Sequence, residues 1–227
     1  MTIQAYHFDG ASPRFEQGPA PQLPGDIADR ISEIWATEKA ENPTLFDGPV
    51  LSVTDITKSV FTVTTMRYSA LLAGFRDPSL RAAIGMRPLA VSGILSCPDG
   101  LVFGRRSDDV TQSPGCWELV PSGGVPPRQD GLPDLAYQIL AELQEEIGLT
   151  EAEIAPPVGY IDDKKSGTID VIMPLRTAVP FSDIRRLDRS GEYTDLIAVD
   201  DLPYFLETCP TLLAASRTIA ETFVPAP

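Results

Sequence analysis

Three glutamates in the middle of the chain, Glu142, Glu145 and Glu146, are spaced so that they could bind a divalent metal ion. Residues three and four apart share one face of a helix. At roughly 100° per residue, Glu142 and Glu146 lie only about 20–60° from Ile139, an apolar residue of the same stretch. Carboxylates crowded beside a buried stripe repel one another and lose water, and both effects raise their pKa. A hard cation such as Mg²⁺, which takes oxygen ligands and bridges to phosphate oxygens, would relieve both.

An ordinary surface helix is the alternative interpretation, and for an isolated Glu-x-x-Glu-Glu it would be preferred. Two further features favour the metal site: a pair of glycines upstream and the scarcity of histidine. His7 is the only histidine, which argues against Ser-His-Asp and Cys-His mechanisms and against histidine metal ligands. Carboxylates would then be the groups that transfer protons and bind the metal ion. Glu192, before an expected strand, is a candidate general base or further ligand, and a solvated loop glutamate is the alternative.

A phosphate-binding turn is predicted at Gly123-Gly124, sixteen residues before Leu140. Glycine permits backbone conformations closed to other residues and lets a ligand approach closely, so the N–H groups there could bind a phosphate. Arg105 and Arg106 follow an expected strand, and either could pair with a diphosphate. Many ordinary turns contain two glycines, and the arginines could equally mark a solvated strand end.

The helix that would carry the three glutamates is predicted from about Pro133 to Ile147. Proline suits the first helical position, and Gly148 suits the residue just past the end. Ile139, Leu143 and Ile147 fall at i, i+4 and i+8, which predicts the buried stripe of this helix.

Strands and helices are expected on both sides of this helix. Residues 10–25 are proline-rich and predict an extended lead-in, after which Asp26 is expected to cap a helix. Strand-like patterns cover residues 50–53, 60–64, 89–96, 101–105, 117–120, 158–161, 168–175 and 195–199, and helical ones cover residues 68–75, 80–84, 202–207 and 212–223. This order predicts an α/β sandwich. We expect a small mixed α/β extension over residues 1–85 and a larger domain over residues 86–227 that ends in a helix.

The composition favours a soluble globular protein. The chain has 227 residues, 18 basic and 32 acidic side chains and a net charge of −14. The electrostatic field of such a negative charge repels polyanions, so a general nucleic-acid binder is not expected. Three separated cysteines with no Cys-x-x-Cys pair argue against a disulfide framework or structural zinc and fit a reducing cytoplasm. We see no signal peptide and no apolar run of the ~18 residues that would cross a membrane. The oligomeric state stays open, a homodimer included.

Together these residues resemble the signature of the Nudix hydrolases. The segment Glu142-Leu143-Gln144-Glu145-Glu146-Ile147-Gly148-Leu149 matches its second half without a gap. The resemblance implies a Nudix-type α/β/α sandwich for the larger domain. It also implies that the three glutamates bind Mg²⁺ or Mn²⁺, while water attacks a phosphorus of a nucleoside diphosphate linked to another moiety.

The first half of the signature departs from the family. Gly124 lies three residues too far from the helix, Pro133 stands where an early glutamate is usual, and Ala141 replaces the signature arginine. Asp130 or Asp134 could substitute for the missing acid.

The UDP-glucose pyrophosphatase branch of the family shares the arginine-less helix. It is also similar to residues 34–48 and to residues 103–115. The branch implies hydrolysis of UDP-glucose or UDP-galactose to UMP and a sugar 1-phosphate. The alternatives are a non-catalytic module that binds nucleotide sugars on a Nudix scaffold, and a Nudix hydrolase acting on ADP-ribose or coenzyme A.

Overall fold

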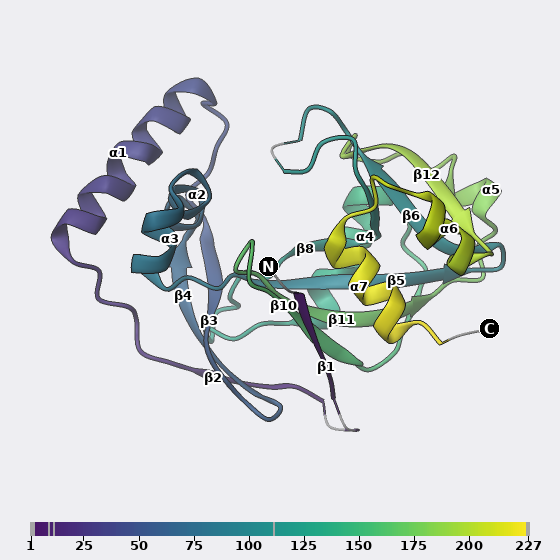
Figure 1. The fold of residues 1–227 in the computed structure, drawn as a ribbon, viewed down its shortest axis with the longest axis horizontal. Coiled ribbons are helices and arrows are strands. Elements are labelled where there is room, and N and C mark those ends of the chain that lie inside the picture. Colours follow the sequence, from purple (N-terminus) through teal and green to yellow (C-terminus); the bar gives the residue numbers. More distant parts are fainter. Residues whose placement is uncertain (1–2, 9, 11, 111, 226–227) are drawn as a thin grey trace.

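The structure is a computed structural model that describes residues 3–8, 10, 12–110 and 112–225. Two sheets organise it (Figure 1). The larger sheet contains β1 (Ile3–His7), β5 (Leu89–Cys97), β6 (Gly100–Arg106), β7 (Trp117–Leu119), β8 (Ser122–Gly124), β9 (Glu153–Ile154), β10 (Gly159–Asp163), β11 (Ile169–Arg176) and β12 (Tyr193–Val199). Its main order is β1-β10-β11-β5-β6-β12, with β7 on β6, β8 on β5 and β9 on β11.

Helices cover both faces of the larger sheet (Figure 1). The helix α4 (Leu135–Ile147) packs on one face and α7 (Ala214–Phe223) on the other. Side chains of β5 alternate between the two layers, because successive residues of a strand point to opposite faces. Val91 and Leu95 share a core with Ile139 of α4, whereas Ile94 shares a core with Ile219 of α7. The predicted α/β class and the α/β/α layering are therefore confirmed. The short helices α5 (Phe181–Ile184) and α6 (Leu202–Thr208) complete this part.

The local sequence explains both ends of α4. The Asp134 carboxylate accepts a hydrogen bond from the Tyr137 N–H at 3.0 Å and caps the first turn. Gly148 ends the helix at a φ of 73°, a left-handed conformation that glycine adopts without strain. The prediction that Pro133 opens the helix is wrong by two residues, because the cap sits at Asp134. The predicted stripe of Ile139, Leu143 and Ile147 is confirmed, since all three are fully buried.

The N-terminal part of the chain forms a smaller sheet, in the order β2-β4-β3. Its strands are β2 (Arg14–Gln17), β3 (Pro49–Thr57) and β4 (Val60–Arg67), and its helices are α1 (Gly25–Glu41), α2 (Tyr68–Arg76) and α3 (Pro78–Ile84). Met66 packs with Ile31 and Ala70 of these helices. Val53 and Phe61 belong instead to the core that contains α4.

The division at residue 85 stays a proposal about the organisation of the chain. The division falls between α3 and β5. However, β1 from the N-terminal part pairs with β10 in the larger sheet, where Ala5 lies opposite Ile161. This strand was not expected from the sequence.

The predicted cap at Asp26 is also wrong, because α1 begins at Gly25 with no side-chain hydrogen bond at its cap. Asp26 lies in the first turn, where its charge suits the helix dipole.

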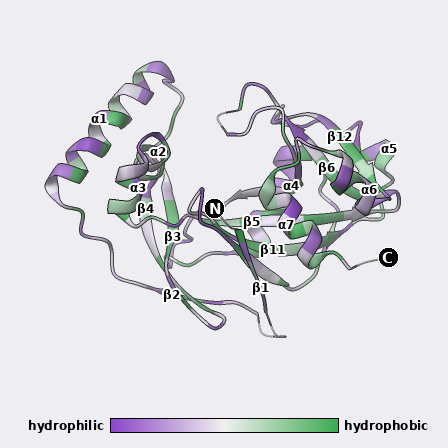
Figure 2. Cartoon of the chain, viewed as in Figure 1, coloured by the Kyte–Doolittle hydropathy of each residue, from purple (hydrophilic) through white to green (hydrophobic). Residues whose placement is uncertain are grey.

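Hydrophobic residues concentrate along the central strands, whereas α1 alternates between hydrophilic and hydrophobic stretches (Figure 2). Within the described part of the chain, no helix is long and apolar enough to span a lipid bilayer.

The α4 packing predicts a contrast between two leucines of the same helix. Leu143→Ala should lower the free energy of unfolding by about 2–5 kcal/mol, because it leaves a cavity in a fully buried core. Leu140→Ala, at a position that is 37% exposed, should cost about 0.5 kcal/mol. Urea unfolding of the two variants measures both, and equal losses would contradict the assigned faces of α4.

Candidate functional site

The Glu146 side chain is the most unusual polar group of α4, because it is only 1% exposed and one of its two carboxylate oxygens has no partner among the residues that the structure describes. Its Oε2 accepts a hydrogen bond from the Ser122 N–H of β8 at 3.1 Å. Its Oε1 has no hydrogen-bond partner among the described residues. Burial, followed by the charges of Glu192 and Glu118, raises the pKa of Glu146 well above its ordinary value. Since buried polar atoms are nearly always bonded, a buried oxygen without a partner in the described part of the chain is unusual.

Glu142 lies half-buried beside Glu146 on the same edge of α4. It accepts a hydrogen bond from Gln138 Nε2 at 2.6 Å, and burial raises its pKa. Its carboxylate lies directly over Gly123: a Cβ at that position would come within 1.9 Å of Glu142 Oε1. Gly123 therefore provides the space in which a helix carboxylate approaches the backbone of β8.

The predicted turn at Gly123-Gly124 is wrong, because both residues belong to β8. In the antiparallel pairing with β5, Gly123 lies opposite Val91 and Gly124 opposite Ala90. Gly124 is exposed, and an added Cβ there would meet nothing within 4 Å. A phosphate contact at Gly124 stays a prediction, but it would be made by an open strand end.

A second buried carboxylate, Glu118 of β7, lies near Glu146 and was not singled out in the sequence. It accepts hydrogen bonds from Arg106 and, at 2.9 Å, from the Tyr193 hydroxyl. Burial raises its pKa, although Arg106 opposes that shift. The only sequence signal was a charged residue inside a short apolar strand, Trp117-Glu118-Leu119. Tyr193, whose pKa is also raised well above its ordinary value by burial, gave no such signal.

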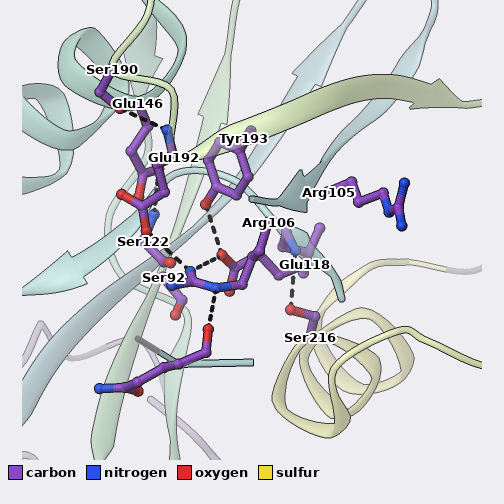
Figure 3. Close-up of polar contacts among 12 residues, drawn as sticks. Ser92, Arg105, Arg106, Glu118, Ser122, Glu146, Ser190, Glu192, Tyr193 and Ser216 are labelled. Atoms are coloured by element: carbon purple, nitrogen blue, oxygen red, sulfur yellow. Dashed lines mark hydrogen bonds and ion pairs between the residues drawn. The ribbon is translucent and has the colours of Figure 1, made fainter. Parts of the chain in front are cut away.

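The two arginines of β6 take opposite directions (Figure 3). The Arg106 side chain is 13% exposed, and its guanidinium lies between Glu118 and Glu192, with Nη1 at 3.2 Å from Glu192 Oε1. Arg105 points away from these glutamates and bonds the Gly115 carbonyl at 3.3 Å. Successive strand residues face opposite sides, so only one of the pair could reach the site. The structure brings Arg106 to the predicted site and leaves Arg105 apart from it.

The remaining predicted residues differ in exposure. The Glu192 side chain is about a third exposed, and its charge contributes to the raised pKa of both Glu146 and Glu142. Glu145 is exposed, but its backbone carbonyl accepts the Ser190 N–H at 3.0 Å. The loop before β12 is thus tied to α4, next to the other glutamates.

The donor chemistry suits a hard divalent cation. Carboxylate oxygens are the ligands that such ions prefer, and a cation would satisfy Glu146 Oε1 and offset the neighbouring negative charges. Among residues 3–8, 10, 12–110 and 112–225, no group of three or more Asp, Glu, His or Cys side chains is arranged so that it could hold a metal ion. The assignment of Glu142, Glu145 and Glu146 as ligands therefore rests on their chemistry and on the free oxygen.

Comparison with known proteins supplies structural likenesses only. No family model matches the chain, and no curated protein matches it. The MutT protein from Methanosarcina mazei Go1 is 21% identical, with a TM-score of 0.48, over 60% of this chain and 91% of that one.

Two further solved structures give similar values. A bifunctional NMN adenylyltransferase/ADP ribose pyrophosphatase from Francisella tularensis is 17% identical, with a TM-score of 0.46, over 66% of this chain and 44% of that one. The chain thus spans less than half of the Francisella protein. The Nudix domain of Shewanella oneidensis NrtR, solved with ADP ribose, is 18% identical, with a TM-score of 0.43, over 64% and 90%. These likenesses do not decide what this chain binds or does.

Gly123 and Gly124 offer a matched test of the packing between α4 and β8. Gly123→Ala should cost about 1–3 kcal/mol of unfolding free energy, because its Cβ would displace the Glu142 carboxylate. Gly124→Ala has open space and should be neutral or stabilising by up to about 1 kcal/mol. Denaturant unfolding checks the difference, and a neutral Gly123→Ala would contradict the close approach of Glu142.

The buried Glu146 predicts how stability depends on pH. Its raised pKa means that the folded chain holds this proton where the unfolded chain has released it, so stability should fall as pH rises from about 4.5. Glu146→Gln keeps the size and the acceptor for Ser122 but removes the titration. The variant should show a shallower decline and greater stability at neutral pH.

Unfolding free energies measured across pH for both proteins test this. Glu118 and Glu142 shift in the same direction, so some slope should remain in the variant. Identical slopes would show that Glu146 does not titrate as the structure implies.

Proposed function

We propose that this chain is a metal-dependent pyrophosphohydrolase of the Nudix type, which cleaves a nucleoside diphosphate linked to another moiety. The observation that carries the proposal is the buried Oε1 of Glu146, which has no hydrogen-bond partner in the part of the chain that the structure describes. The negative charges of Glu192, Glu118 and Glu142 lie around it. The resemblance of residues 142–149 to the Nudix signature supports the same reaction.

Under this proposal Glu142, Glu145 and Glu146 hold Mg²⁺ or Mn²⁺. The ion, when bound, would neutralise phosphate oxygens and lower the pKa of the attacking water. Glu192 is the candidate general base, since its partly exposed carboxylate lies close enough to Glu146 and Glu142 to raise the pKa of both.

Of the predicted phosphate ligands, Gly124 is exposed and stays a candidate, whereas Arg105, although exposed, points away from the glutamates. Arg106 and Gly123 are already packed against glutamates. An anionic substrate would therefore depend on the metal ion to offset a chain charge of −14.

A nucleotide sugar, UDP-glucose or UDP-galactose, is the substrate we propose, on the likeness of residues 34–48 and 103–115 to the UDP-sugar branch. ADP-ribose and coenzyme A are the alternatives, and a solved structure similar in fold was determined with ADP ribose.

A non-catalytic binding module is the second candidate function. It is favoured by Ala141 and Pro133, which stand where the Nudix signature has an arginine and a glutamate.

A substrate panel with Mg²⁺ or Mn²⁺ separates these functions. UDP-glucose, UDP-galactose, ADP-ribose and coenzyme A are incubated with wild type, Glu146→Gln and Glu151→Gln. We expect metal-dependent release of UMP from a UDP-sugar and a loss of at least about 100-fold in Glu146→Gln, because the change removes a ligand rather than an outer-shell partner. Glu151→Gln alters an exposed glutamate just beyond α4 and should behave as wild type. Tight UDP-sugar binding without turnover, unchanged in Glu146→Gln, would establish the binding module instead.

A further inference from the structure

The Arg106 side chain is buried in the carboxylate site and makes three polar contacts there. Its Nη1 lies within ion-pair distance of Glu118 and, at 3.2 Å, of Glu192 Oε1. Its Nε donates to the Gln112 carbonyl at 2.9 Å. An arginine side chain that is only 13% exposed loses much of the hydration of its charge, and such burial is tolerated when charge partners compensate for it. These contacts engage the Nε and Nη1 atoms of Arg106 with groups of the protein itself.

Three segments that are distant in sequence meet at this guanidinium. Arg106 ends β6, Glu118 lies in β7 and Glu192 lies in the loop before β12. The backbone reinforces the junction: the Ser107 N–H donates to the Glu192 carbonyl at 2.7 Å. The Ser190 N–H of the same loop donates to the Glu145 carbonyl of α4 at 3.0 Å. Glu192 is thus held on one side by Arg106 and its neighbour, and its loop is tied to α4.

The two glutamates depend on Arg106 to different degrees. Glu118 is buried and also accepts the Tyr193 hydroxyl, so it keeps a partner without the arginine. Glu192 is about a third exposed, and Arg106 is its only ion-pair partner in the described residues. Without Arg106, Glu192 would face the negative charges of Glu146 and Glu142, and water would be its favourable alternative. The arginine therefore opposes an outward movement of Glu192.

We propose that Arg106 is a positioning residue that holds Glu192 against the carboxylates of α4, where Glu192 takes part in binding the divalent cation and in the reaction. This inference rests on the proposed function. It assigns to Arg106 a role different from the phosphate contact expected from the sequence.

A double-mutant cycle tests whether Arg106 acts through Glu192. Arg106→Met removes the charge but keeps an unbranched side chain that can fill the site, and Glu192→Gln removes the charge that Arg106 holds. In wild type we expect Arg106→Met to lower kcat about 10–100-fold and to change KM less than about 3-fold. In the Glu192→Gln background the same change should alter kcat less than about 3-fold, because the interaction is already lost. Equal effects in both backgrounds would overturn the proposal.

Binding of Mn²⁺ alone, followed by the EPR signal of the free ion, gives a readout that needs no turnover. Removing a cation beside carboxylates would tighten Mn²⁺ binding through charge alone. Loss of the Glu192 position predicts the opposite, a weakening of about 10-fold that disappears in the Glu192→Gln background. Tighter binding in Arg106→Met, or weakening that is equal in both backgrounds, would overturn the proposal.

The two readouts also separate this inference from the proposed function. If no form of the protein hydrolyses a substrate, the Mn²⁺ cycle still decides the role of Arg106. Arg87→Met is the matched control, because Arg87 pairs with the buried Asp162 at 2.7 Å on β10, beyond β5 and β11 from the site. It should leave kcat and Mn²⁺ affinity unchanged. If Arg106→Met does not fold, Arg106→Gln, which also removes the charge but keeps a polar side chain, is used in the same cycle.

Discussion

The burial of Glu146 between α4 and β8 is the constraint on which the rest of the site depends. A carboxylate removed from water needs hydrogen bonds or a compensating charge, and the Ser122 N–H satisfies only one of its oxygens. That bond requires the helix to lie against the strand, and the missing side chain of Gly123 gives Glu142 its space there.

Two buried glutamates show how the same residue type takes different roles in one site. Glu118 is satisfied inside the protein by Arg106 and Tyr193. Glu146 lacks such partners and keeps a free oxygen among the described residues. A satisfied buried charge stabilises one arrangement of its neighbours, whereas a buried carboxyl group that lacks partners lowers the stability of the folded chain. The site therefore combines one glutamate, Glu118, whose partners fix its position, with another, Glu146, that has an oxygen without a partner in the described residues.

Helical periodicity was predicted well from the sequence, whereas the cap at Asp26, the turn at Gly123-Gly124 and the long-range pairings were not. The buried stripe of α4, its end at Gly148 and the position of Glu146 at the border of that stripe follow from helical periodicity. Glu118 and Tyr193 were missed because strand pairing through β6 brings them to Arg106. At Gly123 the sequence showed that a side chain was absent. Only the packing shows that a carboxylate of the protein itself uses the space.

The core shared by the two sheets means that the N-terminal part of the chain cannot act as an independent lid. Val53 and Phe61 of the smaller sheet lie in the same apolar cluster as Ile139 of α4. Swinging that sheet away would expose this cluster to water, at a cost of about 25 cal/mol for each Å² of apolar surface. The smaller sheet is therefore fixed relative to α4 and its glutamates. Under the proposed function, selection of a substrate by size and shape would rest on a preformed surface rather than on closure of the N-terminal part around the substrate.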